Sequence, residues 1–119
     1  MKMRYFKMAK EFSEFGEHHQ HRIGSLLVKG NRVISWGFNR QKTHSLSPHP
    51  YKYIHSEWDT IRKCNPEDVY GSTIYVSRSK KNGTPAMSRP CPSCYSMLKE
   101  LGVKTICYTV EGSYEMEDL

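Results

Sequence analysis

Two short motifs, far apart in the sequence, constrain the fold most because they can bind one metal ion together. The first contains His55 and Glu57, and the second contains Cys91 and Cys94 with two residues between them. Two cysteines at this spacing can present both thiolates to one ion. A histidine from another segment can be the third ligand and leave a fourth position open, as in catalytic zinc sites. We therefore expect the chain to bring residues 55–57 and 90–94 together.

Glu57 has the right chemistry for proton transfer beside that open position. Zinc lowers the pKa of a bound water toward neutrality, and a nearby carboxylate can pass the proton to a leaving group. This combination suits attack on an electron-poor carbon that carries an amine. In the alternative, Cys64 and Cys107 would complete an all-cysteine structural site. We favour this less, because an isolated cysteine within a strand or helix is usually a buried small hydrophobic residue.

The pattern of apolar residues predicts alternating helices and strands. Helices are predicted over residues 3–15, 55–64 and 91–101. Strands are predicted over residues 23–28, 33–38, 72–77 and 104–110. Gly30 and Asn31 favour an antiparallel hairpin between the first two strands. The last two strands flank a helix, so we expect them to be parallel. Residues 111–114 show no clear element.

These elements predict a single domain, residues 1–119, with an α/β fold. A sandwich around a mixed sheet of about four to five strands would hold an antiparallel hairpin followed by a βαβ unit. No apolar run approaches the roughly 18 residues that span a bilayer, so we expect no membrane partner. No secretory signal is visible, and the four cysteines are expected to be reduced thiols or metal ligands, so we predict a cytoplasmic protein.

The charge of the chain is positive. Lys and Arg number 18 against 12 Asp and Glu, and the acids concentrate near the C-terminus. We therefore expect an anionic ligand, either a phosphorylated small molecule or a nucleic acid. Cations that adjoin the motif-bearing elements could bind a 5′-phosphate, namely Lys42, His44, Arg78 and Arg89. The histidines at 18, 19 and 21 are interpreted as a helix end rather than a second metal site.

The paired motifs resemble the zinc-dependent cytidine and deoxycytidylate deaminase superfamily, and small phage and bacterial members most of all. The signature is histidine-x-glutamate followed by proline-cysteine-x-x-cysteine. The order of elements agrees over residues 5–110. The resemblance implies a cytidine-deaminase-like three-layer sandwich and one Zn²⁺ per chain on His55, Cys91 and Cys94. It also implies that Glu57 is the general acid and base.

The same resemblance implies how a substrate is bound. Asn39 would contact the sugar, and the backbone N–H of Ser56 would meet the carbonyl of the base. Residue 56 is usually alanine in the superfamily, and serine leaves this backbone contact available. The implied reaction is hydrolytic deamination of a cytosine nucleotide, which gives the uracil form and ammonia. Deoxycytidylate is favoured because one phosphate suits a few loop cations, and residues 78–89 are expected to select the substrate.

Two other functions stay open. The same chemistry could act on cytosine or adenine in single-stranded DNA or RNA, where bases would stack on Phe38, Tyr51, Tyr53 and Trp58. A non-catalytic zinc module that binds nucleic acid is the alternative of another class. We also expect a homo-oligomer, because the chain lacks the C-terminal helices of larger superfamily members.

Overall fold

The computed structural model describes residues 1–17, 21–41 and 53–119. The helices are α1 (Met3–Ser13), α2 (Ser56–Ile61), α3 (Pro66–Val69) and α4 (Pro92–Glu100). The main sheet contains β1 (Ile23–Lys29), β2 (Arg32–Phe38), β5 (Thr73–Ser79), β6 (Pro85–Ala86), β7 (Thr105–Val110) and β8 (Ser113–Asp118). A separate two-stranded sheet pairs β3 (Arg40–Gln41) with β4 (Tyr53–Ile54). Within these described ranges, no helix is long and apolar enough to cross a membrane.

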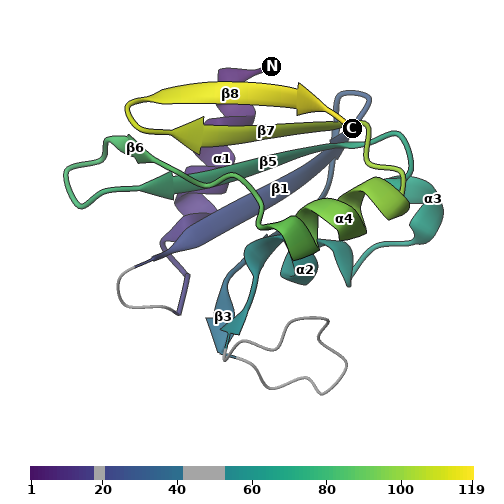
Figure 1. The fold of residues 1–119 in the computed structure, drawn as a ribbon, viewed down its shortest axis with the longest axis horizontal. Coiled ribbons are helices and arrows are strands. Elements are labelled where there is room, and N and C mark those ends of the chain that lie inside the picture. Colours follow the sequence, from purple (N-terminus) through teal and green to yellow (C-terminus); the bar gives the residue numbers. More distant parts are fainter. Residues whose placement is uncertain (18–20, 42–52) are drawn as a thin grey trace.

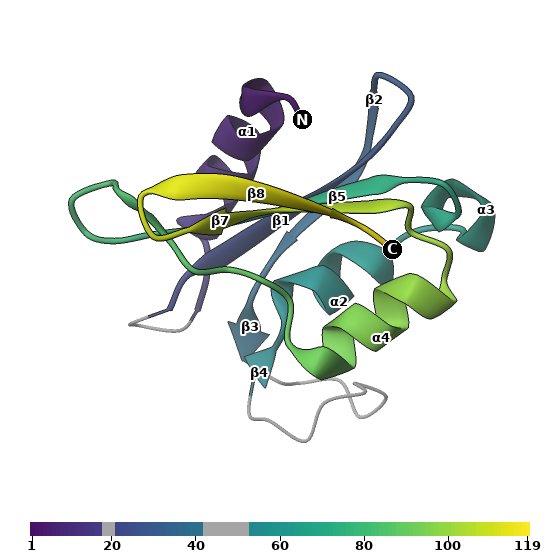
Figure 2. The same ribbon diagram turned by 45° about the horizontal axis from the view of Figure 1, so that its top comes forward.

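Three layers build the molecule (Figures 1 and 2). The central sheet has the order β2-β1-β5-β7-β8, with β6 paired to β5. Helix α1 covers one face, and α2 and α4 lie side by side on the other. The β1–β2 hairpin is antiparallel and β5 is parallel to β7, with α4 between them in sequence. The predicted α/β sandwich with a mixed sheet is therefore confirmed.

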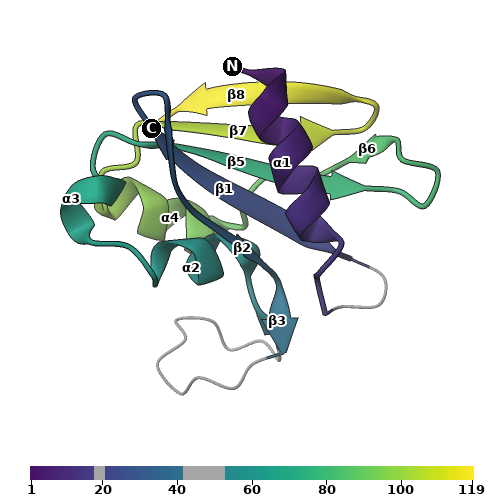
Figure 3. The ribbon, with the colours of Figure 1, turned by 180° about the vertical axis from the view of Figure 1, so that it is seen from behind.

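A hydrophobic cluster fills the space on each side of the sheet. Between the sheet and α2 and α4, the buried residues are Leu27, Ile61, Val69, Ile74, Val76, Leu98, Val103, Ile106 and Tyr108. Between the sheet and α1, seen in front in Figure 3, they are Tyr5, Phe6, Ala9, Leu26, Val28, Tyr75 and Cys107. Alternation along β1 sends Leu26 to one cluster and Leu27 to the other, as expected for a strand covered on both faces.

Two glycines in the hairpin let helices approach opposite faces of the sheet. A Cβ on Gly24 of β1 would lie 2.2 Å from the carbonyl oxygen of Ala9 in α1. A Cβ on Gly37 of β2 would lie 2.6 Å from Oγ1 and 2.7 Å from the backbone N of Thr60 in α2. All these distances are shorter than a tolerated contact. At the observed separation between the helices and the sheet, only glycine therefore fits at these two positions.

The C-terminal end differs from the prediction, which assigned no element to residues 111–114. The chain turns at Gly112, where φ is 68°, and then forms β8 antiparallel to β7. The ring of Tyr114 packs 4.6 Å from the ring of Phe6 in α1. Hairpin pairing with β7 and this contact with α1 stabilise a strand that its acidic composition conceals. Helix α2 also ends earlier than predicted, and the short α3 follows it with Pro66 in its first turn.

We predict that Gly37→Ala destabilises the fold by about 2 to 3 kcal/mol, because the added Cβ overpacks the contact between β2 and α2. Gly30→Ala is the matched control. Gly30 has a φ of 57°, and no atom of the described residues lies within 4 Å of the place that a Cβ would take. Its cost is therefore backbone strain alone, about 1 kcal/mol. Urea unfolding followed by circular dichroism measures both. Equal losses would contradict the close approach of α2 to β2.

Candidate active site

The donor atoms of the three predicted metal ligands lie together at one end of α2 and α4. Nδ1 of His55 is 3.6 Å from Sγ of Cys91 and 3.5 Å from Sγ of Cys94. All three donor atoms lie within 4.8 Å of one another. Cys64 bonds to a backbone carbonyl at the far end of α2, and Cys107 lies in the cluster under α1. The all-cysteine alternative is therefore not assembled.

The spacing and chemistry of this group fit a zinc ion. Zn–S bonds of about 2.3 Å and Zn–N bonds of about 2.0 Å at a tetrahedral angle place nitrogen and sulfur about 3.5 Å apart. Burial lowers the pKa of His55, which keeps the imidazole neutral and able to coordinate. Burial, followed by the nearby charges of Glu57 and Cys91, raises the pKa of Cys94. A cation would offset these penalties and favour the thiolate.

Two ligands occupy equivalent positions at the starts of their helices. His55 is the N-cap of α2, with φ −67° and ψ 149°, and Cys91 is the N-cap of α4, with φ −64° and ψ 163°. Pro92 follows Cys91 in the first turn of α4, where its fixed φ suits a helix start. The positive ends of both helices thus point at the ligand group, and this field favours thiolate over thiol.

Glu57 lies beside the ligands with its carboxylate shielded from solvent. The residue is only 4% exposed. Oγ of Ser56 donates a hydrogen bond of 2.6 Å to Oε1 of Glu57. The serine that replaces the usual alanine of the superfamily therefore orients the carboxylate, which the sequence did not predict.

A cavity of about 260 Å³ opens onto this group. The residues that line it are His21, Ile23, Asn39, His55, Ser56, Glu57, Met87, Ser88, Arg89 and Cys91. Asn39 is buried in its wall, where Nδ2 donates to the carbonyl of His21 at 2.6 Å and Oδ1 accepts from the N–H of Ile23 at 3.0 Å. Asn39 therefore fixes the segment that enters β1 as well as lining the cavity.

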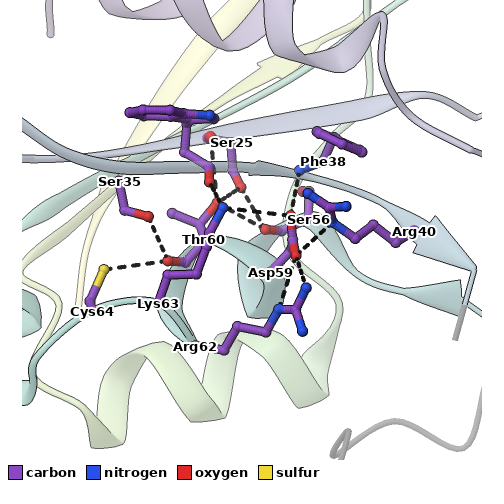
Figure 4. Close-up of polar contacts among 11 residues, drawn as sticks. Ser25, Ser35, Phe38, Arg40, Ser56, Asp59, Thr60, Arg62, Lys63 and Cys64 are labelled. Atoms are coloured by element: carbon purple, nitrogen blue, oxygen red, sulfur yellow. Dashed lines mark hydrogen bonds and ion pairs between the residues drawn. The ribbon is translucent and has the colours of Figure 1, made fainter. Parts of the chain in front are cut away.

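Hydroxyl groups hold the first turn of α2 against the sheet (Figure 4). Oγ of Ser25 in β1 donates to the carbonyl of Ser56 at 2.8 Å and lies 2.5 Å from Oγ1 of Thr60. Oγ1 of Thr60 also donates to the Ser56 carbonyl at 3.0 Å. All three residues are buried, so their hydrogen bonds fix the position of residue 56 and its two neighbours.

Asp59 anchors the same helix to the edge of β2 (Figure 4). Its side chain is fully buried, and Oδ1 accepts from Nε of Arg40 at 2.9 Å and from Nη2 of Arg62 at 2.7 Å. Oδ2 accepts from the backbone N–H of Phe38 at 3.2 Å. Lys63 donates to the carbonyl of Trp36. Asp59 and Lys63 therefore satisfy the backbone groups of Phe38 and Trp36 at the outer edge of β2, which blocks pairing with another strand there.

Of the four predicted phosphate-binding cations, the structure describes Arg78 and Arg89, and both adjoin the cavity. Nη1 of Arg78 donates to the carbonyl of Met87 at 3.3 Å, and Met87 lines the cavity. Arg89 lines the cavity too, but its guanidinium pairs with Glu117. Lys42 and His44 lie outside the described residues, as does Tyr51.

Several cavity and supporting residues were not predicted. His21 was interpreted as part of a helix end, and no function was assigned to Ile23. Met87 and Ser88 lie in the segment 78–89 that was expected to select the substrate, but neither was given a role of its own. The sequence around Asp59 is typical of an acidic residue on the exposed side of a helix, so its burial was not predicted. Its partner Arg40 is 19 residues away. The small residue Ser56 beside Glu57 had been predicted to contact the substrate through its backbone, but the hydrogen bond from its side chain to Glu57 had not been predicted.

We predict that Asp59→Ala lowers the free energy of unfolding by about 3 kcal/mol. The substitution removes the buried carboxylate that pairs with Arg40 and Arg62 and accepts the backbone N–H of Phe38. The value is at the low end for a buried pair because the side chains of Arg40 and Lys63 are 35% and 41% exposed. Asp68→Ala, in α3, is the control and should cost less than 1 kcal/mol, as an ordinary surface change does (about 0.5 kcal/mol). Thermal and urea unfolding measure both, and equal effects would refute the anchoring role.

Known proteins share both the sequence pattern and the fold. The family model described as the cytidine and deoxycytidylate deaminase zinc-binding region matches residues 1–110. The deoxycytidylate deaminase of Mycobacterium phage D29 is 22% identical over 112 residues, covering 76% of this chain and 80% of that protein. Among solved structures, the dCMP deaminase of cyanophage S-TIM5 in apo form is 23% identical, with a TM-score of 0.69 and coverage of 91% of this chain and 84% of that one.

The fold extends to cytidine deaminases. The cytidine deaminase of Burkholderia pseudomallei is 18% identical, with a TM-score of 0.68 and coverage of 99% of this chain and 92% of that one. This likeness confirms the predicted cytidine-deaminase-like architecture. The family match confirms the predicted superfamily and an enzyme of the cytidine and deoxycytidylate deaminase type. The chain belongs to the cytidine and deoxycytidylate deaminase zinc-binding family.

Proposed function

We propose that the protein is a zinc-dependent hydrolytic deaminase that converts a cytosine nucleotide, with deoxycytidylate favoured, to its uracil form. Water supplies the new oxygen at the ring carbon, the C–N bond to the exocyclic amine breaks, and ammonia leaves. The observation that supports this most is the placement of the buried Glu57 beside the donor atoms of His55, Cys91 and Cys94 at the floor of the cavity.

One zinc ion per chain would be held by His55, Cys91 and Cys94. When bound there, zinc acts as a Lewis acid that makes water a nucleophile near neutral pH. The two thiolates would come from one helix start and the imidazole from another, and both His55 and Cys91 line the cavity. The donor spacing and the neutral imidazole support this assignment.

Glu57 would carry protons between the water and the leaving amine. Its carboxylate accepts a proton as the water attacks and donates a proton to the amine nitrogen, so that ammonia can depart. The hydrogen bond from Ser56 restricts the rotation of the carboxylate. Burial in a cavity wall keeps bulk water from competing for these transfers.

The remaining contacts to the substrate would come from the cavity wall. The backbone N–H of Ser56 is proposed to meet the base carbonyl, and Asn39 to contact the sugar. The Asn39 amide still has one N–H and one lone pair beyond its bonds to residues 21 and 23. These two contacts would orient the base with its amine-bearing carbon toward Glu57.

The phosphate would lie at the rim of the cavity. We propose Arg78 as a contact because it donates to the carbonyl of Met87, a lining residue. Arg89 stays a predicted contact through the N–H groups that Glu117 does not take, and Lys42 and His44 stay predicted contacts. The volume of about 260 Å³ suits a mononucleotide, since it falls near the lower end of the roughly 300–1,000 Å³ typical of ligand sites. The S-TIM5 enzyme has been solved with dCMP and dUMP.

Single-stranded nucleic acid is a second candidate substrate, supported by an aromatic surface next to the cavity. Phe38 precedes the cavity residue Asn39, and its ring lies 5.8 Å from that of Phe15, which is 63% exposed. The guanidinium of Arg40 lies 4.1 Å from the centre of the Phe38 ring. Bases could stack here. Activity on oligonucleotides that falls steeply with salt, without a fall on the mononucleotide, would favour this substrate.

Oligomeric state and location complete the proposal. Two exposed aromatic side chains, Phe15 just after α1 and Trp36 on β2, support a homo-oligomer. The grouping of Cys91 and Cys94 with His55 as metal donors, rather than as disulfide partners, supports a cytoplasmic location. Light scattering at micromolar concentration tests the oligomeric state, and a monomer would contradict the proposed homo-oligomer.

We predict that Glu57→Gln lowers kcat on deoxycytidylate at least about 10³-fold, because proton transfer is lost, while zinc content is unchanged. Ammonia release is measured on cytidine, deoxycytidine, their monophosphates and short oligonucleotides. Glu100→Gln, at the exposed end of α4, is the control and should retain full activity. No turnover by the unmodified protein on any substrate, or turnover that survives Glu57→Gln, would refute the proposed reaction.

Metal removal provides a separate prediction. The purified protein should hold about one zinc per chain, since the described part of the chain assembles one three-ligand group. Cys91→Ser should release it and abolish deamination, whereas Cys64→Ser should retain both. Zinc content is measured by atomic absorption after dialysis. Undiminished zinc in Cys91→Ser would contradict the assignment of the ligands.

A further inference from the structure

The acidic C-terminal strand β8 contacts the segment that leads into Cys91 through an ion pair between Glu117 and Arg89. Alternation along β8 turns Glu115 and Glu117 toward the face of the sheet that α4 covers. The hydroxyl of Tyr108 in β7 donates to Oε2 of Glu117 at 2.6 Å and lies 3.2 Å from Oε2 of Glu115. The two glutamates therefore share a tyrosine, which makes them a matched pair on one strand.

Glu117 differs from Glu115 because it holds Arg89 in a two-pronged ion pair. Nε of Arg89 is 2.7 Å from Oε2 of Glu117, and Nη2 is 3.1 Å from Oε1. The guanidinium also lies 5.0 Å from the ring centre of Tyr95 in α4. Arg89 is thus braced against both β8 and α4. Such planar, bidentate geometry fixes the orientation of an arginine far better than a single contact does.

Only Pro90 separates Arg89 from the ligand Cys91. Pro90 is buried and its ring fixes φ, so this linker is stiff. On the other side of Arg89, the backbone N–H of Ser88 donates to the carbonyl of Thr109 at 2.9 Å, and its Oγ donates to the carbonyl of Val76 at 2.9 Å. Residues 88–91 are therefore attached to β5 and β7 through Ser88, and to β8 through Arg89.

We propose that Glu117 is a positioning residue for the metal site: it holds Arg89, and thereby keeps Cys91 in the place where it meets His55 and Cys94. This inference rests on the proposed zinc site. Glu117 is neither one of the three ligands nor one of the residues that line the cavity, and its effect passes through Arg89 and Pro90. The last strand of the fold, which carries none of the motif residues, then determines how firmly the metal is retained.

The exposure of the ion pair between Arg89 and Glu117 indicates how large its effect should be. The side chains of Arg89 and Glu117 are 42% and 32% exposed, so the pair adds little to global stability. Its effect falls on the local geometry of Cys91 instead. Residues that orient metal ligands typically change metal affinity by about 10- to 100-fold, and one acting through an intervening residue should lie at the low end of that range.

The experiment measures how fast the metal leaves in the absence of substrate. Protein loaded with Co²⁺ shows a thiolate-to-metal absorption band, and its decay in excess chelator gives the release rate. We expect Glu117→Gln to accelerate release about 5- to 10-fold. Glu115→Gln is the matched control, because it removes the neighbouring carboxylate on the same Tyr108, and its release rate should equal that of the unmodified protein.

Two further variants separate positioning from loss of structure. Arg89→Met should accelerate release as Glu117→Gln does, and the double variant should release no faster than either single variant. The exchange of Arg89→Glu with Glu117→Arg should restore slow release. Equal release rates in Glu117→Gln and Glu115→Gln would overturn the proposal, as would additive effects in the double variant. Unmodified protein that binds no metal would instead refute the proposed zinc site itself.

Discussion

The positions of His55, Cys91 and Cys94 depend on two helices that start at the same end of one sheet face. Both α2 and α4 lie on that face, and each begins with a ligand at its N-cap (Figure 2). A ligand at an N-cap lies at the end of its helix, so two helices that start near each other can bring their first residues together. The dipoles of both helices then point at the same spot and favour the anionic donors placed there.

Different interactions hold the two helices in place. Beneath α2, the buried hydroxyls of Ser25 and Thr60 and the buried carboxylate of Asp59 bind backbone groups directly. Gly37 leaves room for this approach. On the α4 side, Ser88 and Arg89 attach the preceding segment to the strands. The buried polar groups among these residues, on Ser25, Asp59, Thr60 and Ser88, specify one arrangement more than they add net stability, which suits a site that needs fixed geometry.

Local patterns in the sequence predicted the hairpin, the parallel βαβ unit and the two segments that carry the metal ligands. Cysteines two residues apart, the turn glycine at 30 and periodic apolar residues are local signals. Most of the supporting contacts could not be predicted, because they join residues distant in sequence. Asp59 meets Arg40 across 19 residues, and Arg89 meets Glu117 across 28. The strand β8 was missed because its acidic composition resembles that of a solvated tail, although the adjacent strand β7 was predicted.

The coordination shell of zinc in the intact protein tests the central claim most directly. X-ray absorption at the zinc edge measures the number and type of ligand atoms without reference to activity. We expect two sulfur atoms at about 2.3 Å and two nitrogen or oxygen atoms at about 2.0 Å, one of them from an imidazole. A shell of three or four sulfur atoms would contradict the site on His55, Cys91 and Cys94.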